Sequence, residues 1–437
     1  MFSMMHTRPH SVRKRMLSNA YSKSYLQNSP HMDAVSKAVL LGRYLPIIHA
    51  AAETKSPIEI HLVNNALTMD FVSGYQYGLP NSTNLLENVE ERKRIFHLYH
   101  CRKPYELHRQ EIPNLTAWCN WIGIPIVPKF VGTASAELQD WCMKMVMGAD
   151  SYVSTHFRGE EIKPGDEPNI YRQLKLSMLK SNSDAEKGQT LDTPLPSTQQ
   201  LEIAAEMYDH MTAGNETSGI ALTYCFWELS QHPLLQMALR NELMRLEHPI
   251  IYPVKTGETI RLPDPKDVDA LPLLNAILME TLRLHTPIPG GQPRITPMVP
   301  TTLAGYDNLP PSVRVNAQAY SLHRNTNVFP EPEKWIPDRW LRTDDPKKAE
   351  EMKRWFWAFG SGGRMCIGSN LAMQGMFGGN PSEMAVLTYP SAEMKLTLAA
   401  LYTNFTSSIV DDEGIEQDDA YTAQPRGFKL TLKFDHV

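Results

Sequence analysis

Apolar residues recur at helical spacing through most of the first half of the chain. From Asp33 to Thr54, and again from Ile58 to Phe71, they fall three or four positions apart and would share one face of an amphipathic helix. The alternation that is typical of half-buried strands is scarce here. The uncharged segment 112–128 contains three prolines, so we interpret it as a buried, loop-rich stretch rather than a membrane span.

A long helix is predicted after the polar, proline-containing linker at 181–200. Ser197, with Gln200 three residues later, matches a capping box, and apolar residues then continue to Leu229 before Pro233 ends the run. This pattern predicts one helix of more than about thirty residues. Because it is apolar on most sides, such a helix belongs inside a large helical domain.

The interior of this helix contains the unusual sequence Ala-Gly-Asn-Glu-Thr at 213–217. Glycine inside a helix costs about 1 kcal/mol relative to alanine, so its presence needs a reason. One interpretation is an ordinary kink or an exposed turn. The other is a ligand that lies against the backbone at Gly214 and is faced by the side chains of Glu216 and Thr217.

The second half of the chain combines a further helix with strand signals. Pro272 suits a first helical turn, and a stripe of apolar residues follows down to Leu284. Glu280 and Arg283 lie on one face of this helix, where an ordinary surface ion pair would contribute under about 0.5 kcal/mol. Beyond it, the residues around Arg294 and from Tyr306 to Val315 predict short strands in a smaller β-containing lobe.

Composition and charge exclude several classes of protein. The chain has 437 residues, 42% of them hydrophobic, which is enough for a large core and consistent with anything from one to about three domains. A net charge of -5 gives no overall attraction to nucleic acid or to an anionic membrane. Residues 1–17 contain no apolar segment, so they predict neither a signal peptide nor a membrane anchor, and the chain as written is expected to be soluble.

The five cysteines are an odd number with no Cys-x-x-Cys pair, which argues against a disulfide framework and a zinc ribbon and leaves at least one free thiol. A metal-binding module is a weak alternative, because its candidate ligands fall in a charged helical segment. Those candidates are His97, His100, Cys101 and His108.

The densest chemistry lies in the loop Phe359–Gly368, which carries four glycines, an arginine and one cysteine ahead of an apolar helix. A phosphate loop would need Gly-Lys-Ser/Thr, which is absent. A buried, inert cysteine would not need these neighbours. A nucleophilic cysteine would want a histidine base, which the sequence does not exclude. A fourth interpretation is a thiolate ligand to a metal or haem iron, since glycines allow a flat cofactor to approach and backbone amides stabilise the sulfur.

This loop resembles the haem-binding signature Phe-x-x-Gly-x-Arg-x-Cys-x-Gly of the cytochrome P-450 monooxygenases. Every fixed position is matched, by Phe359, Gly362, Arg364, Cys366 and Gly368. Three further segments resemble family motifs in the same order, namely 213–217 in the central helix, the Glu-x-x-Arg at 280–283 and Pro-Asp-Arg-Trp at 337–340. Together the four motifs favour this family, and most closely its microsomal fungal branch of secondary metabolism, over the separate interpretations above.

The resemblance implies a fold and a set of cofactor-binding residues. The fold would be mainly α with a smaller β-rich lobe, in a single haem-binding monooxygenase domain over 1–437. Cys366 would be the axial ligand of the haem iron. Phe359 would pack against its sulfur, and Gly368 and Gly214 would lie next to the haem. Arg364 and Arg294 would pair with the haem propionates, for which His10 and Lys14 are weaker candidates.

The resemblance also implies catalytic and structural roles. Thr217 would donate a hydrogen bond during oxygen activation, and Glu216 would help to deliver protons. Glu280, Arg283 and Arg339 would form a buried charged triad that holds the haem-binding core together, which is a structural task.

The reaction implied is the insertion of one atom of O2 into a lipophilic small molecule. The cofactor would be heme b, and electrons would come from NADPH through a separate reductase, because the chain has no nucleotide-binding motif. Nucleic acid is not an expected partner. Two alternatives are a haem-dependent isomerase or dehydratase that uses no O2, and a haem-deficient remnant or mis-annotated gene product of the family.

Two departures from the family pattern lead to further expectations. Full-length microsomal members begin with an anchor in the endoplasmic reticulum membrane, whereas segment 10–15 already resembles a later helix, so we expect an N-terminally truncated chain without that anchor. Joining 370–374 directly to 393–401 restores an amphipathic helix. We therefore interpret 375–392 as an insertion outside the family pattern. Our hypothesis is a retained intron, and a genuine loop insertion is the alternative.

Overall fold

The computed structural model describes residues 7–156, 162–181, 190–254, 261–341, 345–373 and 393–437. These residues belong to two compact units. The first comprises Met1–Ile47 and Asn65–Asn215, and the second comprises Ile48–Asn64 and Glu216–Val437. The insertion expected at 375–392 lies outside the described residues, and the expectation of one haem domain over 1–437 stays a prediction.

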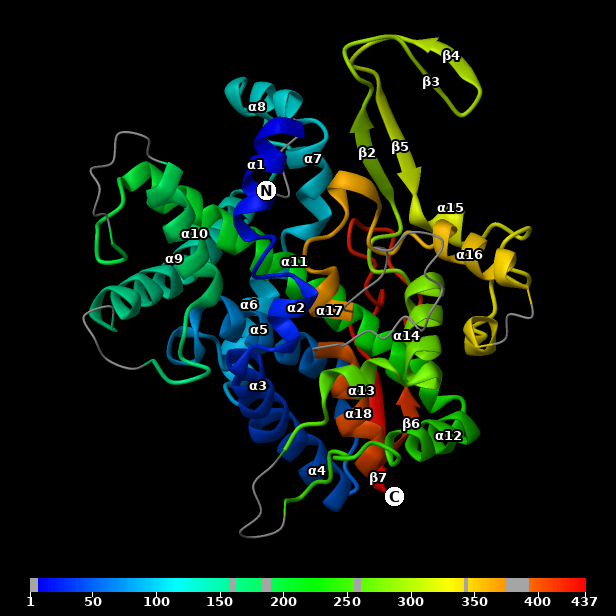
Figure 1. Cartoon of the computed structure of the whole chain (residues 1–437). Helices are drawn as coiled ribbons and strands as arrows, with labels where there is room; N and C mark the ends of the chain where they lie inside the picture. The colour runs from blue at the N-terminus through cyan, green and yellow to red at the C-terminus, as the bar shows by residue number, and fades with distance from the viewer. Residues whose placement is uncertain (1–6, 157–161, 182–189, 255–260, 342–344, 374–392) are drawn as a thin grey trace. The chain divides into compact units, whose positions relative to one another are not determined.

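The first unit is helical in its described part (Figure 1). Helices α4, α5 and α11 continue from one unit into the other. In chain order the elements are α1 (Thr7–Leu17), α2 (Lys23–Gln27), α3 (Pro30–Ser36), the π-helix η1 (Lys37–Tyr44), α4 (Leu45–Glu53), α5 (Ile60–Tyr77), the short 3₁₀ helix η2 (Leu79–Asn81), α6 (Val89–His100), the 3₁₀ helix η3 (Lys103–Tyr105), α7 (Glu106–Gln110), α8 (Pro113–Trp121), α9 (Lys129–His156), α10 (Asn169–Ser181) and α11 (Ser197–Ser230).

The predicted helices of the first half are confirmed. The periodic segment from Asp33 to Thr54 forms α3, η1 and α4 in succession. The second segment begins with the two-residue strand β1 (Ile58–Glu59) and continues as α5. The long helix α11 has 34 residues. It begins at Ser197 itself, and the Gln200 side chain donates a hydrogen bond to the Leu195 carbonyl oxygen at 3.0 Å, so the expected capping box is not the observed N-terminal contact.

A buried carboxylate, Asp70 of α5, holds the chain that follows this helix. Its oxygens accept hydrogen bonds from the Thr83 hydroxyl at 2.6 Å and from the backbone N–H groups of Leu85 and Leu86 at 2.7 and 3.1 Å. The Arg43 guanidinium lies 3.5 Å away. Burial raises the pKa of Asp70 and these donors oppose that rise. The carboxylate therefore organises a turn whose backbone groups would otherwise lack partners.

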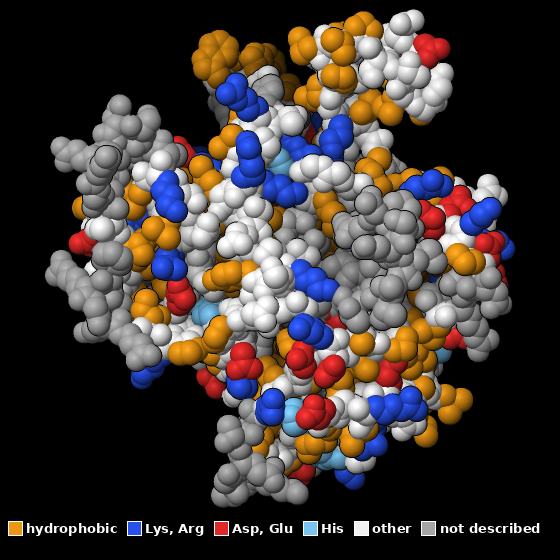
Figure 2. Space-filling view, viewed as in Figure 1, with side chains coloured by type: hydrophobic (Ala, Val, Ile, Leu, Met, Phe, Trp, Pro, Cys, Tyr) orange, Lys and Arg blue, Asp and Glu red, His pale blue; other side chains and the backbone are white. Residues whose placement is uncertain are grey.

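The interpretation of 112–128 as buried and loop-rich is wrong. Residues 113–121 form helix α8, and none of its residues is buried. Pro113 occupies the first turn, which tolerates proline, and the other two prolines follow the helix, so they delimit it rather than break it. Trp118 is 54% exposed and Trp121 is 82% exposed. Hydrophobic side chains are visible over α8 in Figure 2.

The second unit combines helices with three small sheets. After β1, its elements are α12 (Pro233–Leu243), α13 (Pro265–Asp269), α14 (Pro272–Leu284), β2 (Gly291–Ile295), β3 (Thr301–Leu303), β4 (Tyr306–Leu309), β5 (Arg314–Gln318), α15 (Ala319–His323), the 3₁₀ helix η4 (Pro337–Trp340), α16 (Pro346–Trp355), the 3₁₀ helix η5 (Gly362–Arg364), α17 (Ser369–Met373), α18 (Glu393–Asn404), β6 (Phe405–Asp411) and β7 (Thr431–His436).

The sheets confirm the β-containing lobe that the sequence predicts. Strands β2 and β5 pair antiparallel, and they lead into the antiparallel β3–β4 hairpin, as Figure 1 shows. A third sheet has the order β1-β7-β6, with both pairs antiparallel. Helix α14 has the predicted bounds. In the part of the chain that the structure describes, no helix is both long and apolar enough to span a membrane.

The buried position of Asp70 generates a stability prediction. Replacing Asp70 with alanine removes the acceptor of three hydrogen bonds, so we expect the free energy of unfolding to fall by about 3 kcal/mol. The matched control is Asp33→Ala, which removes an exposed pair with Lys37 and should cost under about 1 kcal/mol. Urea unfolding followed by circular dichroism measures both changes, and similar losses for the two variants would contradict the role given to Asp70.

Candidate active site

The Cys366 loop is a tight backbone structure in which the cysteine is exposed. The Cys366 N–H donates to the carbonyl oxygen of Phe359 at 2.9 Å, which closes the loop on itself. Helix α17 begins three residues later. Cys366 is exposed, whereas Cys142 and Cys225 are buried and Cys101 and Cys119 are half-buried. Among the five cysteines it is thus the one whose sulfur a large ligand could reach.

The thiols of the two buried cysteines differ chemically from a metal ligand. Burial raises the pKa of the Cys142 thiol to about 11 and that of Cys225 to about 12, so both are protonated at neutral pH. Cys142 shares a hydrogen bond with the Tyr77 hydroxyl, and Cys225 accepts one from Thr281. Both therefore serve as packed, inert side chains.

Two glycines of the loop are required by its backbone. Gly360 and Gly362 have φ of +67° and +66°, a region that residues with a Cβ rarely adopt. A Cβ on Gly360 would also lie 2.9 Å from the Gln292 side-chain oxygen of β2. At Gly368, by contrast, a Cβ would lie 3.8 Å from the Cys366 sulfur. Gly360 and Gly362 thus allow the backbone turn, and Gly368 leaves the space beside the sulfur free of a side chain.

Two arginines lie near each other beside this loop. The pKa of Arg364 is lowered by partial burial and by the positive charge of Arg294 on β2. The guanidinium of Arg294 donates to the carbonyl oxygen of Pro293 at 2.8 Å. Two neighbouring cations repel each other, so the arrangement favours an anion with more than one negative charge.

A fully buried carboxylate, Glu280 of α14, receives five hydrogen bonds. Arg283 donates to it in bidentate fashion, with its Nε and Nη2 at 2.9 and 2.8 Å. The Nε of Arg339 lies 2.8 Å from Oε1, which brings together the triad expected from the sequence. The Ile336 N–H and the Trp340 indole N–H supply the remaining bonds at 2.9 and 2.8 Å. The interpretation of this pair as an ordinary surface ion pair is therefore wrong.

Arg283 is as completely satisfied as its partner. Besides the two bonds to Glu280, it donates to three backbone carbonyl oxygens at 2.7 to 3.0 Å, those of His323, Pro332 and Lys334. Both side chains have no exposed surface. A buried ion pair is tolerated only when the remaining donors and acceptors are paired, and this one meets that condition. The triad thus ties α14 to the segment 332–340.

His323 connects the triad to the segment that leads into the Cys366 loop, and no pattern in the sequence pointed to it. Its Nδ1 donates to the Arg283 carbonyl oxygen at 2.8 Å, and its Nε2 accepts from the Trp357 N–H at 2.7 Å. Its ring stacks on Phe356. Burial lowers the pKa of His323 to about 3, which keeps the imidazole neutral as this bridge requires. A single histidine in a sequence is compatible with too many roles to predict this one.

The residues of the central-helix motif are divided between the two units. In the second unit, Glu216 Oε2 accepts a hydrogen bond from the Thr422 hydroxyl at 2.8 Å, and Thr217 is half-buried. In the first unit, a Cβ on Gly214 would lie 2.7 Å from the Val72 side chain of α5. The close approach of α5 is a sufficient reason for this glycine, and its expected contact with the haem stays a prediction.

His10 and Lys14 lie on α1 of the first unit.

The weak metal-module alternative gains no support. Within the described ranges, the one group of three or more His, Cys, Asp or Glu side chains close enough to share an ion consists of His49, Glu53 and His436. His97 and His100 lie in the last turn of α6, and the Cys101 thiol donates to the Leu98 carbonyl oxygen.

Comparison with known proteins decides the family. The family profile named cytochrome P-450 matches residues 112–378, which is more than half of the chain and includes α14 and the Cys366 loop. The chain belongs to the cytochrome P-450 family. This confirms the resemblance drawn from the four motifs and the mainly helical fold with small sheets.

The curated relatives are fungal proteins, as the sequence predicts. Cytochrome P-450 monooxygenase avaI of Aspergillus versicolor is 26% identical over 386 residues, which cover 86% of this chain and 81% of the relative. Monooxygenase tazI of Aspergillus terreus is 34% identical, covering 53% of this chain and 42% of the relative. Monooxygenase BOT1 of Botryotinia fuckeliana is 35% identical, covering 40% and 31%. The chain thus spans less than half the length of the last two.

The residues of the second unit fit the haem that this family carries. An exposed thiol on a glycine-rich turn offers a soft axial ligand, and the paired guanidiniums of Arg294 and Arg364 suit the two carboxylates of a haem. The family implies the haem cofactor. The ligand and propionate assignments of Cys366, Arg364 and Arg294 remain proposals that this donor set supports.

The Glu280 cluster generates the prediction for this site. In Glu280→Gln, the amide N–H group would face the donors of Arg283 and Arg339, so we expect the free energy of unfolding to fall by about 3 to 5 kcal/mol. The matched control is Glu333→Gln. The Glu333 side chain is 67% exposed and pairs with Arg324, so this variant should lower the free energy of unfolding by under about 1 kcal/mol.

Urea unfolding and the haem-to-protein ratio of the purified variants measure this effect together. Loss of both stability and haem in Glu280→Gln alone supports the role of the triad. Two variants with equal stability would contradict it.

Proposed function

We propose that this chain is a haem-thiolate monooxygenase that inserts one oxygen atom from O2 into a lipophilic small molecule of fungal secondary metabolism. The observation that carries the proposal is the Cys366 loop, where the one exposed thiol of the chain lies on a glycine-dependent turn ahead of α17. Family membership and the fungal monooxygenases among the relatives support the same reaction class.

Within this proposal, the haem is iron protoporphyrin IX, or heme b. Cys366 holds its iron, and Phe359 and Gly368 border the sulfur. Arg364 and Arg294 neutralise the propionates, which their mutual repulsion favours. When bound, the haem supplies the electron-transfer and dioxygen chemistry that side chains lack. The Glu280 cluster and His323 support the segment before the loop, because Arg283 donates to the His323 carbonyl oxygen, and His323 accepts from the Trp357 N–H and stacks on Phe356.

Thr217 and Glu216 are the residues that we propose to handle protons. They are consecutive on α11, and the Glu216 carboxylate is oriented by the Thr422 hydroxyl. A carboxylate can receive a proton at its oxygen and pass it on, and a hydroxyl can donate a hydrogen bond and be replenished. The presence of Thr217 favours a monooxygenase over an isomerase or dehydratase that uses no O2.

The partners follow from the same proposal. The two electrons per turnover would come from NADPH through a separate reductase, because the sequence carries no nucleotide-binding motif of its own. We retain the proposals of one functional haem domain over 1–437 and of an inserted segment at 375–392. The substrate is a lipophilic small molecule.

We also propose that the protein associates with a membrane surface, as expected for a full-length member in the endoplasmic reticulum. Helix α8 and the residues after it present exposed apolar side chains that include Trp118, Trp121 and Ile124. Tryptophan favours the interface between lipid headgroups and hydrocarbon, and so large an exposed group of apolar side chains on one segment is unusual for a surface in water.

The experiment that tests the proposed function is a carbon monoxide difference spectrum of the reduced protein. The wild-type chain should show the absorption band of a thiolate-ligated haem, and Cys366→Ala should lose it. The matched control, Cys119→Ser, changes a half-buried thiol of α8 and should retain the band. Wild-type protein that takes up haem without this band would sink the proposal, and so would a band that survives in Cys366→Ala.

The membrane proposal has a separate test. Trp118→Ala combined with Trp121→Ala should reduce co-sedimentation with phosphatidylcholine vesicles at least about tenfold, because each tryptophan contributes its apolar area to partitioning. Tyr306→Ala, which removes a 71%-exposed aromatic side chain from β4, serves as the control. Unchanged sedimentation of the double variant would rule out α8 as the contact.

A further inference from the structure

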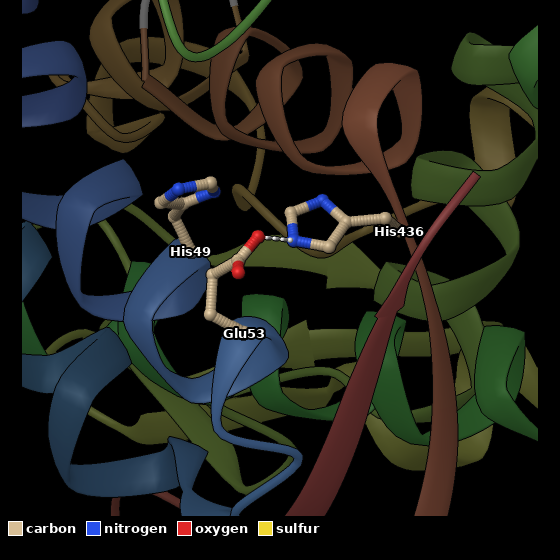
Figure 3. A group of neighbouring side chains, drawn as sticks. All are labelled: His49, Glu53 and His436. Atoms are coloured by element: carbon tan, nitrogen blue, oxygen red, sulfur yellow. Dashed lines mark ion pairs between the residues drawn. The ribbon is translucent and has the colours of Figure 1, made fainter.

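Three potential metal ligands meet at a place that the proposed function does not use. His49 and Glu53 lie one helical turn apart on α4, and His436 lies at the end of β7 (Figure 3). All three belong to the second unit. One ligand atom from each lies within 4.8 Å of the other two. The three side chains point toward one another, although nearly 400 positions separate the helix from the strand.

We propose that His49, Glu53 and His436 form a binding site for a divalent zinc-like ion. Two imidazoles and one carboxylate are a ligand set that Zn²⁺ accepts, with water in a fourth position. Four ligands around zinc at about 2.0 to 2.1 Å lie roughly 3.4 Å apart, so the three groups need to approach by little more than about 1 Å. Imidazole ligands favour zinc and its neighbours over Mg²⁺ and Ca²⁺, which select oxygen.

The surroundings orient two of the ligands before an ion arrives. The ring of His49 packs edge-on against Tyr252 and against His436, with centroid distances of 5.4 and 5.1 Å. His436 Nε2 lies 2.9 Å from Glu53 Oε1, so this pair is already in contact. The spacing of His49 and Glu53 on α4 is the i, i+4 spacing that places two ligands on one helix face.

His49 supplies an independent observation that points to a ligand. Its Nδ1 is buried and has no hydrogen-bond partner among the described residues. A polar atom in that condition normally has a protein, water or ion partner, so it needs an explanation. An ion that binds one nitrogen of the His49 ring would place the proton of the neutral imidazole on the other nitrogen.

The consequence of binding would be structural. The ion would join α4 to β7, the central strand of the β1-β7-β6 sheet and the last element of the chain. An ion that binds the folded chain alone stabilises it by mass action, and the C-terminal strand would gain most because one ligand lies at its end. The site does not involve Cys366 or any residue proposed to hold the haem, so it stands apart from the proposed function.

Equilibrium dialysis of the full chain, with any purification tag removed, against zinc chloride tests this proposal. The wild type should bind one more zinc ion per chain, at micromolar concentration, than His49→Ala or His436→Ala, and each of these should weaken that binding at least about tenfold. Glu53→Gln changes a side chain that is 61% exposed, so it should preserve the fold and still weaken binding. Magnesium chloride in excess should not compete.

The matched control is His248→Ala, which removes another histidine beside a glutamate, Glu247, and which belongs to no group of three or more potential metal ligands among the described residues. It should bind zinc as the wild type does. Hydrogen exchange gives the second measurement, with zinc slowing exchange in β7 of the wild type and leaving Glu53→Gln unchanged. Equal zinc binding by the wild type and Glu53→Gln, together with unchanged exchange in β7, would overturn the proposal.

Discussion

The geometry of the second unit depends on one buried carboxylate. Glu280 has no exposed surface, so its charge is tolerable only because five donors surround it, from Arg283, Arg339, Trp340 and the backbone of Ile336. Removing either arginine would leave the buried carboxylate with less compensating charge, and removing Glu280 would leave two guanidinium groups without their acceptor. The cluster therefore fixes several chain segments in a single arrangement, where an apolar core would permit neighbouring alternatives.

Hydrogen bonds connect this cluster to the segment that precedes the Cys366 loop. Arg283 donates to the His323 carbonyl oxygen, and His323 in return bonds to the carbonyl oxygen of Arg283 and to the Trp357 N–H. Nine residues after Trp357 comes Cys366, on a turn that two glycines with positive φ make possible. Hydrogen bonds through the neutral His323 imidazole thus link the ion pair to Trp357, at the start of the segment that carries the proposed thiolate.

The sequence predicted features that local patterns determine and missed those that depend on distant pairing. The bounds of α14 followed from Pro272 and the apolar stripe because a helix start and its buried face are local properties. The α8 segment was misjudged because prolines that flank a helix and prolines that break one look alike without the surrounding structure. The roles of His323 and of the group His49, Glu53 and His436 could not be predicted, because their partners are distant in the sequence and come together only in the folded chain.

The candidate site was predicted from motif matches, and its geometry adds the reasons for them. The triad meets as expected, whereas Gly214 has a packing reason in Val72 that the sequence could not reveal.

Iron K-edge X-ray absorption of the haem-loaded protein tests the central claim most directly. We predict a sulfur atom among the iron ligands of the wild type and none in Cys366→Ala. Iron bound only by nitrogen and oxygen in the wild type, or sulfur that persists in the variant, would contradict it.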